Sequence, residues 1–283
     1  MPGLAGDRGG WRLNAWLRRL RPQPHAAQRI VVFPHAGGSA GFFRPWIPDL
    51  PAGVELLAVQ YPGRDDRMRE RAADHMDQLV GPAVEAMVPV LDRPFVLFGH
   101  SMGAAVAYEV ALRVQGRAGP ALAGLVVSGQ VGPTAIVPRD RHLWPDPLLW
   151  QEVQRMNGTD ERVAGHGELA SLVLPRLRSD FRVIETYRPT PGPPLRCPVV
   201  ALVGDRDTEA PVDRARRWAD VTRSGFELHV FPGGDHFYLV RHQSEVVDQV
   251  VRCLGHAPDS PSPSEGEGQG GGDVWESQPP KAR

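Results

Sequence analysis

Cysteine is nearly absent from this chain of 283 residues, because Cys197 and Cys253 are the only two. Two cysteines cannot form the disulfide framework that holds a small secreted domain together. No CxxC motif and no cluster of Cys and His residues indicates a metal site. We therefore expect both thiols to be small buried side chains that take no part in chemistry.

An excess of one charge and a long apolar run are also lacking. Lys and Arg number 32 against 33 for Asp and Glu, and the resulting net charge of −1 gives no support for a broad surface that binds nucleic acid. No stretch approaches the roughly 20 apolar residues that span a bilayer, and no apolar core of a secretory signal follows the N-terminal arginines. The sequence predicts a soluble, cytoplasmic protein with neither nucleic acid nor membrane among its partners.

The two ends of the chain differ from the middle. In residues 1–27, apolar side chains recur at helical spacing, which predicts a short amphipathic helix packed on the domain and makes a membrane or partner anchor the less favoured alternative. These side chains are Leu13, Trp16, Leu17 and Leu20. Residues 257–283 are rich in Ser, Pro, Glu and Gly, which bury too little apolar surface to offset their ordering entropy, so we expect a disordered tail.

Between the ends, short β-branched or aromatic runs alternate with longer helical patterns. The predicted strands are Arg29–Phe33, Glu55–Gln60, Pro94–Phe98, Leu122–Ser128, Pro198–Val203 and Phe226–Phe231. The predicted helices are Ala73–Leu91, Met102–Gln115, Arg214–Val221 and Glu245–Leu254. Several strands are apolar at nearly every position, as in a mostly parallel sheet that helices cover on both faces. The chain is therefore predicted to form an α/β fold with its core in residues 28–130 and 190–256.

Residues 131–189 break this alternation. They contain no good strand, and they carry Leu, Val and Trp at helical spacing among many charges. The segment falls between two core strands, where an inserted helical lid would lie. Because lids gate access and shape pockets, we expect this insertion to set the substrate class, with a purely structural insertion as the alternative.

A serine flanked by glycines follows one of the predicted strands. The segment GHSMG (99–103) matches G-x-S-x-G between the strand Pro94–Phe98 and the helix that begins at Met102. This context is typical of the nucleophile elbow of the α/β-hydrolase fold, where the two glycines leave room for the neighbouring strand and helix. Ser101 is the predicted nucleophile.

A serine hydroxyl is a weak nucleophile that needs a base, and in this fold an acidic residue and then a histidine follow the serine along the chain. Asp205 and Asp207 both follow the strand Pro198–Val203. We favour Asp207, because Asp205 lies nearer to the strand, has less freedom to reach a histidine on the next loop, and is better placed to cap the turn.

The predicted base is His236. It ends the segment PGGDH (232–236), which follows the strand Phe226–Phe231 and contains two glycines that allow the loop to turn back over the edge of the sheet. His229 lies inside that strand and His242 begins the last helix, so neither is placed for the same role.

Stabilising the oxyanion requires two backbone N–H donors. One is the amide of Met102, which follows the nucleophile. The other is expected from the loop PHAGG (34–38), whose small residues let the backbone approach the substrate oxygen, and Ala36 is the predicted donor. His35 is expected to support this loop rather than to act in catalysis.

Six segments resemble the type II thioesterases, stand-alone enzymes that accompany modular polyketide and nonribosomal peptide synthases. These segments are PHAGGSAGFF (34–43), QYPGRDDR (60–67), GHSMGA (99–104), DFRVIETYRP (180–189), GDRD (204–207) and PGGDHFYL (232–239). They occur in the family's order, and the resemblance covers residues 28–254.

The resemblance implies hydrolysis of acyl groups from the phosphopantetheine arm of acyl or peptidyl carrier proteins, which removes aberrant chains from a synthase. It places Ser101, Asp207 and His236 on the family's catalytic triad, and Ala36 and Met102 on its oxyanion positions. No cofactor or metal is expected, because the substrate itself carries the pantetheine arm, and the enzyme is expected to be a monomer.

Three other functions stay open on the sequence alone. A Ser/Asp/His set also serves carboxylesterases and lipases that act on small esters, and acyltransferases in which an amine or alcohol replaces water. A non-catalytic module that binds carrier proteins is the third alternative, although the complete set of catalytic side chains argues against it.

Overall fold

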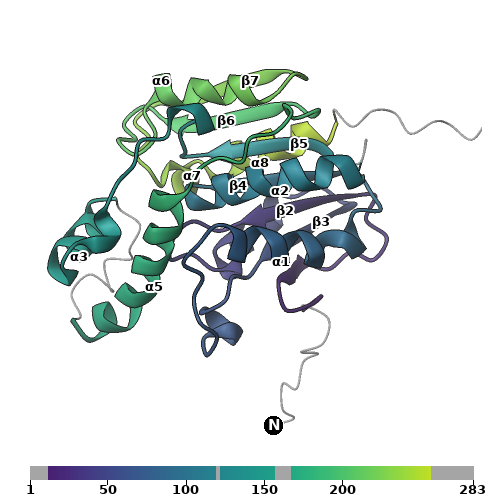
Figure 1. Cartoon of the computed structure of the whole chain (residues 1–283). Helices are drawn as coiled ribbons and strands as arrows, with labels where there is room; N and C mark the ends of the chain where they lie inside the picture. The colour runs from purple at the N-terminus through teal and green to yellow at the C-terminus, as the bar shows by residue number, and fades with distance from the viewer. Residues whose placement is uncertain (1–11, 119–121, 157–166, 256–283) are drawn as a thin grey trace, which may run out of the picture.

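Seven strands form one mixed sheet at the centre of the fold (Figure 1). The computed structural model describes residues 12–118, 122–156 and 167–255. The strand order is β1-β3-β2-β4-β5-β6-β7, in which only β1 runs antiparallel to its neighbour. The strands are β1 (Leu17–Arg21), β2 (Gln28–Phe33), β3 (Val54–Val59), β4 (Phe95–His100), β5 (Leu122–Ser128), β6 (Val199–Gly204) and β7 (Phe226–Phe231).

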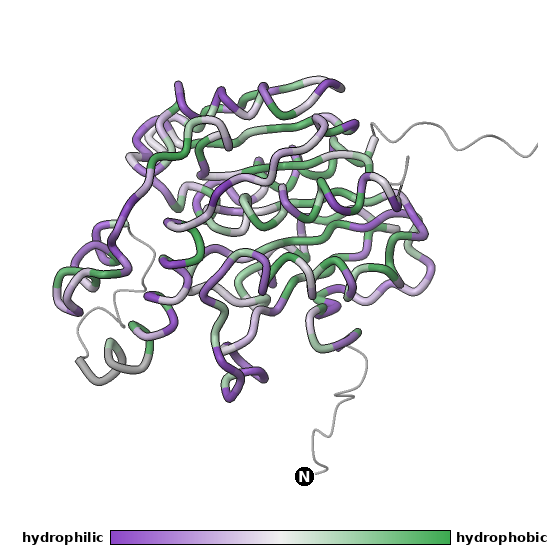
Figure 2. The backbone as a smooth tube through the Cα atoms, in the orientation of Figure 1, coloured by the Kyte–Doolittle hydropathy of each residue, from purple (hydrophilic) through white to green (hydrophobic). Residues whose placement is uncertain are grey.

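Helices cover both faces of the sheet, and each face has its own apolar core. One core joins α1 (Asp77–Met87) and α2 (Met102–Ala118) to strand residues such as Val31 and Phe33. The other joins the 3-10 helix η1 (Ala40–Asp49) and α8 (Gln243–Leu254) to the strand residues that alternate with these and face the opposite side, such as Ile30 and Val32. Strands between two covered faces are apolar at almost every position, and Figure 2 shows them as largely hydrophobic. The α/β prediction is confirmed.

The predicted N-terminal helix is wrong. Leu17–Arg21 form strand β1, which pairs antiparallel with β3. Leu17 and Leu20 point into opposite cores, as an odd spacing requires in a strand, whereas the same spacing also fits one face of a helix. The side chain of Asn14 accepts hydrogen bonds from the amides of Trp16 and Leu17 and so orders the entry into the strand.

Several helix boundaries also differ from the sequence prediction. The predicted helix Ala73–Leu91 is the shorter α1 followed by the 3-10 helix η3 (Val88–Val90). The predicted helix Arg214–Val221 divides into α6 (Val212–Ala215) and the 3-10 helix η7 (Arg216–Val221). Helix η1 escaped prediction because Pro45 and Pro48 interrupt any regular period.

The insertion between β5 and β6 contains four helical elements in its described part. These are η5 (Pro133–Ala135), η6 (Arg141–Leu143), α3 (Asp146–Arg155) and α5 (Gly167–Thr186). Helices α3 and α5 project beyond the ends of the strands, on one side of the sheet (Figure 1). They share a small core of their own, formed by Leu149, Val153, Leu174, Leu177 and Phe181.

Three further predictions concern cysteines, membrane helices and the tail. Cys197 and Cys253 are both buried and free, as expected, and burial raises the pKa of each thiol to about 12. Within the described ranges, no helix combines the length and the apolarity that crossing a membrane would need. The predicted tail at 257–283 lies outside the described residues, as do residues 1–11 of the N-terminal segment.

Candidate active site

Ser101 occupies a sharp turn between β4 and α2. Its φ angle is 53°, a left-handed conformation that L-residues rarely adopt. A Cβ atom on Gly99 would lie 2.1 Å from the carbonyl oxygen of Gly103, and a Cβ on Gly103 would lie 2.1 Å from that of Phe33 in β2. The predicted need for both glycines is confirmed: only hydrogen fits at either position, and the strained turn lifts Ser101 above the sheet edge.

The three side chains predicted to act together meet in a continuous chain of hydrogen bonds. Ser101 Oγ lies 3.0 Å from His236 Nε2, and His236 Nδ1 lies 2.9 Å from Asp207 Oδ2. The other carboxylate oxygen of Asp207 accepts the amides of Glu209 and Ala210 at 2.8 and 3.2 Å. Burial alone would raise the pKa of Asp207, but the hydrogen bond with His236 and these two amides hold it below its ordinary value.

The turn after β6, which carries Asp207, lies in backbone contact with the loop after β7, which carries His236. A Cβ on Gly204 would lie 2.2 Å from the carbonyl oxygen of Gly234, so the two backbones touch. The amide of Arg206 donates to that same carbonyl oxygen at 2.9 Å. The contact therefore fixes the spacing between the end of β6 and the loop after β7.

Two acidic residues near the predicted triad, the alternative Asp205 and the neighbouring Asp235, have different surroundings from Asp207. Asp205 is exposed, and no hydrogen bond of its side chain to the described residues is seen, so the expected capping role is not found there. Asp235 instead caps its own turn, because its carboxylate accepts the amide of Phe237 at 3.0 Å and pairs with Arg241 at 2.8 Å. Neither carboxylate bonds to His236, whereas Asp207 does.

Two backbone amides lie where the sequence predicted oxyanion donors. Met102 is the first residue of α2, and the first amides of a helix have no partner within it. Ala36 lines the same cavity as Ser101, and among the described residues no acceptor binds its amide. The next two amides are engaged, since that of Gly37 donates to Asp180 and that of Gly38 to the His35 carbonyl. The roles of Ala36 and Met102 stay predictions.

His35 packs beneath its own loop. Its ring contacts Phe42 and Phe237 edge to face, with ring centroids 4.6 and 5.0 Å apart. A Cβ on Gly38 would lie 2.8 Å from the same ring. Burial lowers the pKa of His35 to about 3, and the neighbouring His236 contributes, so the ring is neutral at pH 7. These contacts fit the expected supporting role.

His100, a third buried histidine beside His35 and His236, was not singled out from the sequence. His100 Nδ1 lies 2.9 Å from Ser128 Oγ, which lies 2.6 Å from the hydroxyl of Tyr238. The His100 ring is 5.1 Å from that of His236, and burial holds the pKa of His100 well below its ordinary value. The ring of His236 thus packs against a hydrogen-bonded network, and no sequence pattern marks residues so far apart as partners.

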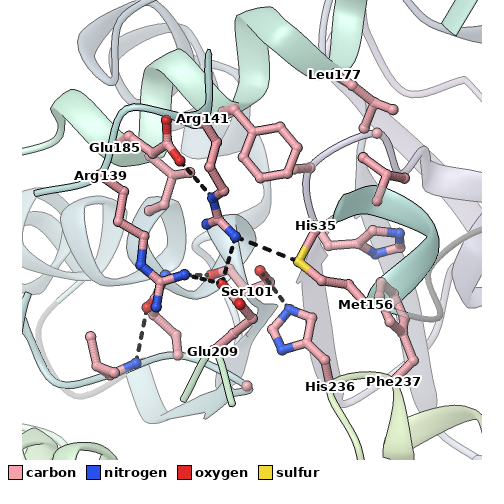
Figure 3. A pocket seen from close by; sticks show the side chains of 18 of the residues that line it. His35, Ser101, Arg139, Arg141, Met156, Leu177, Glu185, Glu209, His236 and Phe237 are labelled. Atoms are coloured by element: carbon pink, nitrogen blue, oxygen red, sulfur yellow. Dashed lines mark hydrogen bonds and ion pairs between the residues drawn. The ribbon is translucent and has the colours of Figure 1, made fainter. Parts of the chain in front are cut away.

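A cavity of about 320 Å³ opens above Ser101. The insertion supplies most of its apolar wall (Figure 3), formed by Val131, Ile136, Val137, Val153, Met156, Val173, Leu177, Phe181 and Ile184. The sheet side supplies Ser101 and His236 together with the loop that carries Ala36. An apolar recess next to a nucleophile is suited to holding an acyl chain.

One wall of this cavity carries a buried network of charges. Arg141 donates to Glu185 at 2.8 Å, to Glu152 at 3.1 Å and to Glu209 at 2.9 Å. Figure 3 shows its guanidinium held between Glu185, Glu209 and the sulfur of Met156. Arg139 also pairs with Glu209.

Glu209 joins this network to the predicted triad. Burial alone would raise the pKa of Glu209, but Arg141 and Arg139 lower it, so the carboxylate stays charged. Its backbone amide donates to Asp207. The insertion is thereby anchored to the loop that orients His236. None of these charged residues was predicted to belong to the site, because charges spread over residues 131–189 also fit the polar face of a helix, and Glu209 lies outside the catalytic motifs.

The family model of the thioesterase domain matches residues 28–256. The chain belongs to the thioesterase family. This membership, on an α/β-hydrolase fold, makes it a hydrolase, and the resemblance inferred from the sequence is confirmed.

Individual relatives agree with this assignment. Thioesterase PikA5 of Streptomyces venezuelae is 42% identical over 236 residues, which cover 83% of this chain and 84% of that protein. The solved structure of the type II thioesterase BorB from the borrelidin biosynthetic cluster is 38% identical, with a TM-score of 0.79 over 85% of this chain and 98% of BorB. YbtT, a type II thioesterase from the yersiniabactin NRPS/PKS pathway, is 31% identical, with a TM-score of 0.76 over 86% and 99%.

Proposed function

We propose that this thioesterase removes aberrant acyl chains from the phosphopantetheine arms of acyl or peptidyl carrier proteins that belong to a modular polyketide or nonribosomal peptide synthase. The observation that carries the proposal is the unbroken chain from Ser101 through His236 to Asp207 at the floor of an apolar cavity. The similarity to BorB and YbtT supports the choice of substrate.

In the proposed acylation step, His236 Nε2 takes the hydroxyl proton as Ser101 Oγ attacks the thioester carbonyl carbon. The amides of Met102 and Ala36 stabilise the negative oxygen of the tetrahedral intermediate. The C–S bond then breaks, His236 gives its proton to the sulfur, and pantetheine leaves as the thiol. Asp207 keeps Nδ1 protonated, so that Nε2 faces the serine as the acceptor.

Deacylation repeats the sequence with water. His236 removes a proton from a water molecule, whose oxygen attacks the acyl–Ser101 ester, and the carboxylic acid leaves as Oγ regains its proton. Neither step requires a metal or a cofactor. The cavity volume of about 320 Å³ lies at the small end of ligand pockets, which favours a short acyl group over a finished product.

The proposal is tested with carrier proteins loaded with a panel of acyl groups. Intact-protein mass spectrometry follows the loss of each acyl group with wild-type enzyme, Ser101→Ala and the control Ser224→Ala, which removes an exposed hydroxyl outside the site. We expect wild type and Ser224→Ala to release short acyl groups at equal rates and Ser101→Ala to release none above background.

The same assay separates the alternatives. Faster turnover of small oxygen esters than of carrier-bound thioesters would favour a carboxylesterase, and transfer to an added amine or alcohol would favour an acyltransferase. Failure of wild type to react with a serine-directed fluorophosphonate would favour a non-catalytic module. We further propose that the enzyme acts as a cytoplasmic monomer, and light scattering coupled to size exclusion measures its mass directly.

A further inference from the structure

The insertion touches the oxyanion loop through one buried carboxylate. Asp180 lies on α5 and is only 2% exposed. Its Oδ2 accepts the backbone amide of Gly37 at 2.7 Å. The same oxygen is paired with the guanidinium of Arg64, which follows β3 and is 5% exposed. Three segments separated in the chain therefore meet at a single atom.

The bond to Gly37 controls the amide next to it. Gly37 has a φ of 78°, and a Cβ there would lie 2.6 Å from the side chain of Leu177 on α5, so the loop turns directly against the helix. The Gly37 amide is held by Asp180 and the Gly38 amide by the carbonyl of His35. The bond to Asp180 fixes the peptide unit that follows Ala36, and the bond from Gly38 fixes the His35 carbonyl, which belongs to the same peptide unit as the Ala36 amide. Together the two bonds set the direction of the Ala36 amide.

The positive charge of Arg64 neutralises the carboxylate of Asp180, which matters for the charge that develops on the substrate. A carboxylate accepts a stronger hydrogen bond than a neutral group does. The carboxylate of Asp180 is bound to the residue that follows Ala36, and without a neighbouring positive charge it would repel the negative oxygen that forms on the substrate. Arg64 neutralises it. The guanidinium lies 5.1 Å from the centre of the Tyr61 ring, and among the described residues Asp180 is the acidic group with which it forms an ion pair.

We infer that Asp180 is a positioning residue for the oxyanion donor Ala36, and that Arg64 balances its charge so that the site can stabilise a developing anion. The inference rests on the proposed function, in which the Ala36 amide binds the oxyanion. Helix α5 would then contact the site in two places. Asp180 binds the oxyanion loop, and Glu185 binds Arg141, which is linked through Glu209 to Asp207.

A purely structural ion pair would give a different result, and the chain contains a matched control. Arg29 and Glu55 are buried to the same degree, 5% and 2% exposed, and are joined at 2.8 Å. They lie near the beginnings of β2 and β3, at the opposite ends of these strands from the oxyanion loop. Glu55 also binds Arg19, and Arg29 also binds Asp92. Removing Glu55 therefore reports what a buried, paired carboxylate far from the oxyanion loop contributes to stability.

The experiment compares Asp180→Ala, Asp180→Asn, Arg64→Met, the double variant Arg64→Met/Asp180→Asn and the control Glu55→Ala. Each is measured for kcat and KM on an acyl-carrier thioester and on a small oxygen ester, for inhibition by a trifluoromethyl ketone analogue of acyl-pantetheine, and for melting temperature. The ketone forms a tetrahedral adduct with Ser101 and so reports binding in the oxyanion hole.

We expect Asp180→Ala and Arg64→Met to lower kcat roughly 10- to 100-fold with little change in KM, because they disturb one donor rather than remove it. Inhibition by the ketone should weaken by the same factor. Asp180→Asn keeps an acceptor oxygen for the Gly37 amide. The double variant keeps this oxygen too, and it also removes the positive charge of Arg64, which a neutral amide at position 180 cannot neutralise. Both should therefore keep kcat within about fivefold of wild type. Glu55→Ala should lower only the melting temperature.

The inference is overturned if Asp180→Ala and Arg64→Met keep wild-type kcat and ketone inhibition, or if the double variant is no better than Arg64→Met. It is also overturned if Glu55→Ala lowers kcat equally. The oxygen ester separates this result from failure of the proposed function. If wild type hydrolyses the ester but not the carrier thioester, the substrate assignment fails, while the variants still test the oxyanion loop.

Discussion

Substituting Arg141 with Met tests whether the charged wall of the cavity holds the insertion in place. The Arg141 side chain is 9% exposed and binds three carboxylates. After the substitution, Glu152 keeps its bond to Arg155, and Glu209 keeps Arg139 and Arg155.

Glu185 is the carboxylate left without an arginine. It is 5% exposed, and among the described residues its carboxylate retains the ring Nδ1 of His142 at 2.8 Å and the backbone amide of His142 at 3.0 Å. Removing one partner of a buried ion pair costs about 3 to 5 kcal/mol. Since two of the three carboxylates remain paired, we expect the lower limit, about 3 kcal/mol, which lowers the melting temperature by roughly 6 to 12 °C in a domain of this size.

Thermal unfolding monitored by circular dichroism measures this shift. The control is Arg117→Met, because Arg117 and Glu85 form an exposed pair whose side chains are 55% and 70% accessible. Such pairs contribute less than about 1 kcal/mol, so the control should melt within roughly 4 °C of wild type. Equal melting of Arg141→Met and wild type would refute the reasoning, because no buried carboxylate would then depend on Arg141.

Three further predictions concern acid stability, the acid of the triad and the turn at the nucleophile. Hydrogen bonds from Arg155 and then Arg141, against the effect of burial, lower the pKa of Glu152 from 4.5 to about 2. A lowered pKa stabilises the fold above pH 4.5 and the gain is lost as the pH falls toward 2, so urea unfolding should show wild type and Glu152→Gln converging over that interval. Asp207→Asn should lower kcat by roughly 10³- to 10⁴-fold, because the amide favours the wrong tautomer of the imidazole, and Asp205→Asn should leave kcat unchanged. Gly103→Ala should abolish labelling by a fluorophosphonate, since its methyl group would lie 2.1 Å from a backbone oxygen of β2.

The predicted triad could be located from sequence because its signals are local. Ser101 sits in a five-residue motif between a strand and a helix, and His236 and Asp207 each follow a strand whose carboxyl end must reach the same edge of the sheet. Strand β1 was misassigned for an equally local reason: the spacing of Leu17 and Leu20 fits a helix as well as a strand, and only pairing with β3 decides between them.

The charged groups that surround the predicted triad and the oxyanion loop could not be paired from the sequence, because their partners are far apart in the chain. Arg64 and Asp180 are 116 positions apart, and Arg141 and Glu209 are 68 apart. Arg64 and Asp180 lie in segments that resemble the type II thioesterases, but the resemblance does not show whether charged side chains are buried and paired or face water. Only the packing of α5 against the loop at Gly37 and of the insertion against Glu209 decides which of them are buried.

The most direct test of the account is to trap the covalent intermediate. Wild-type enzyme is mixed with an acyl-carrier thioester, quenched within milliseconds, digested and analysed by mass spectrometry. The account predicts one acyl group per enzyme molecule, attached to the peptide that contains Ser101 and absent in Ser101→Ala. Hydrolysis without any acyl-enzyme, or an acyl group on another side chain, would contradict it.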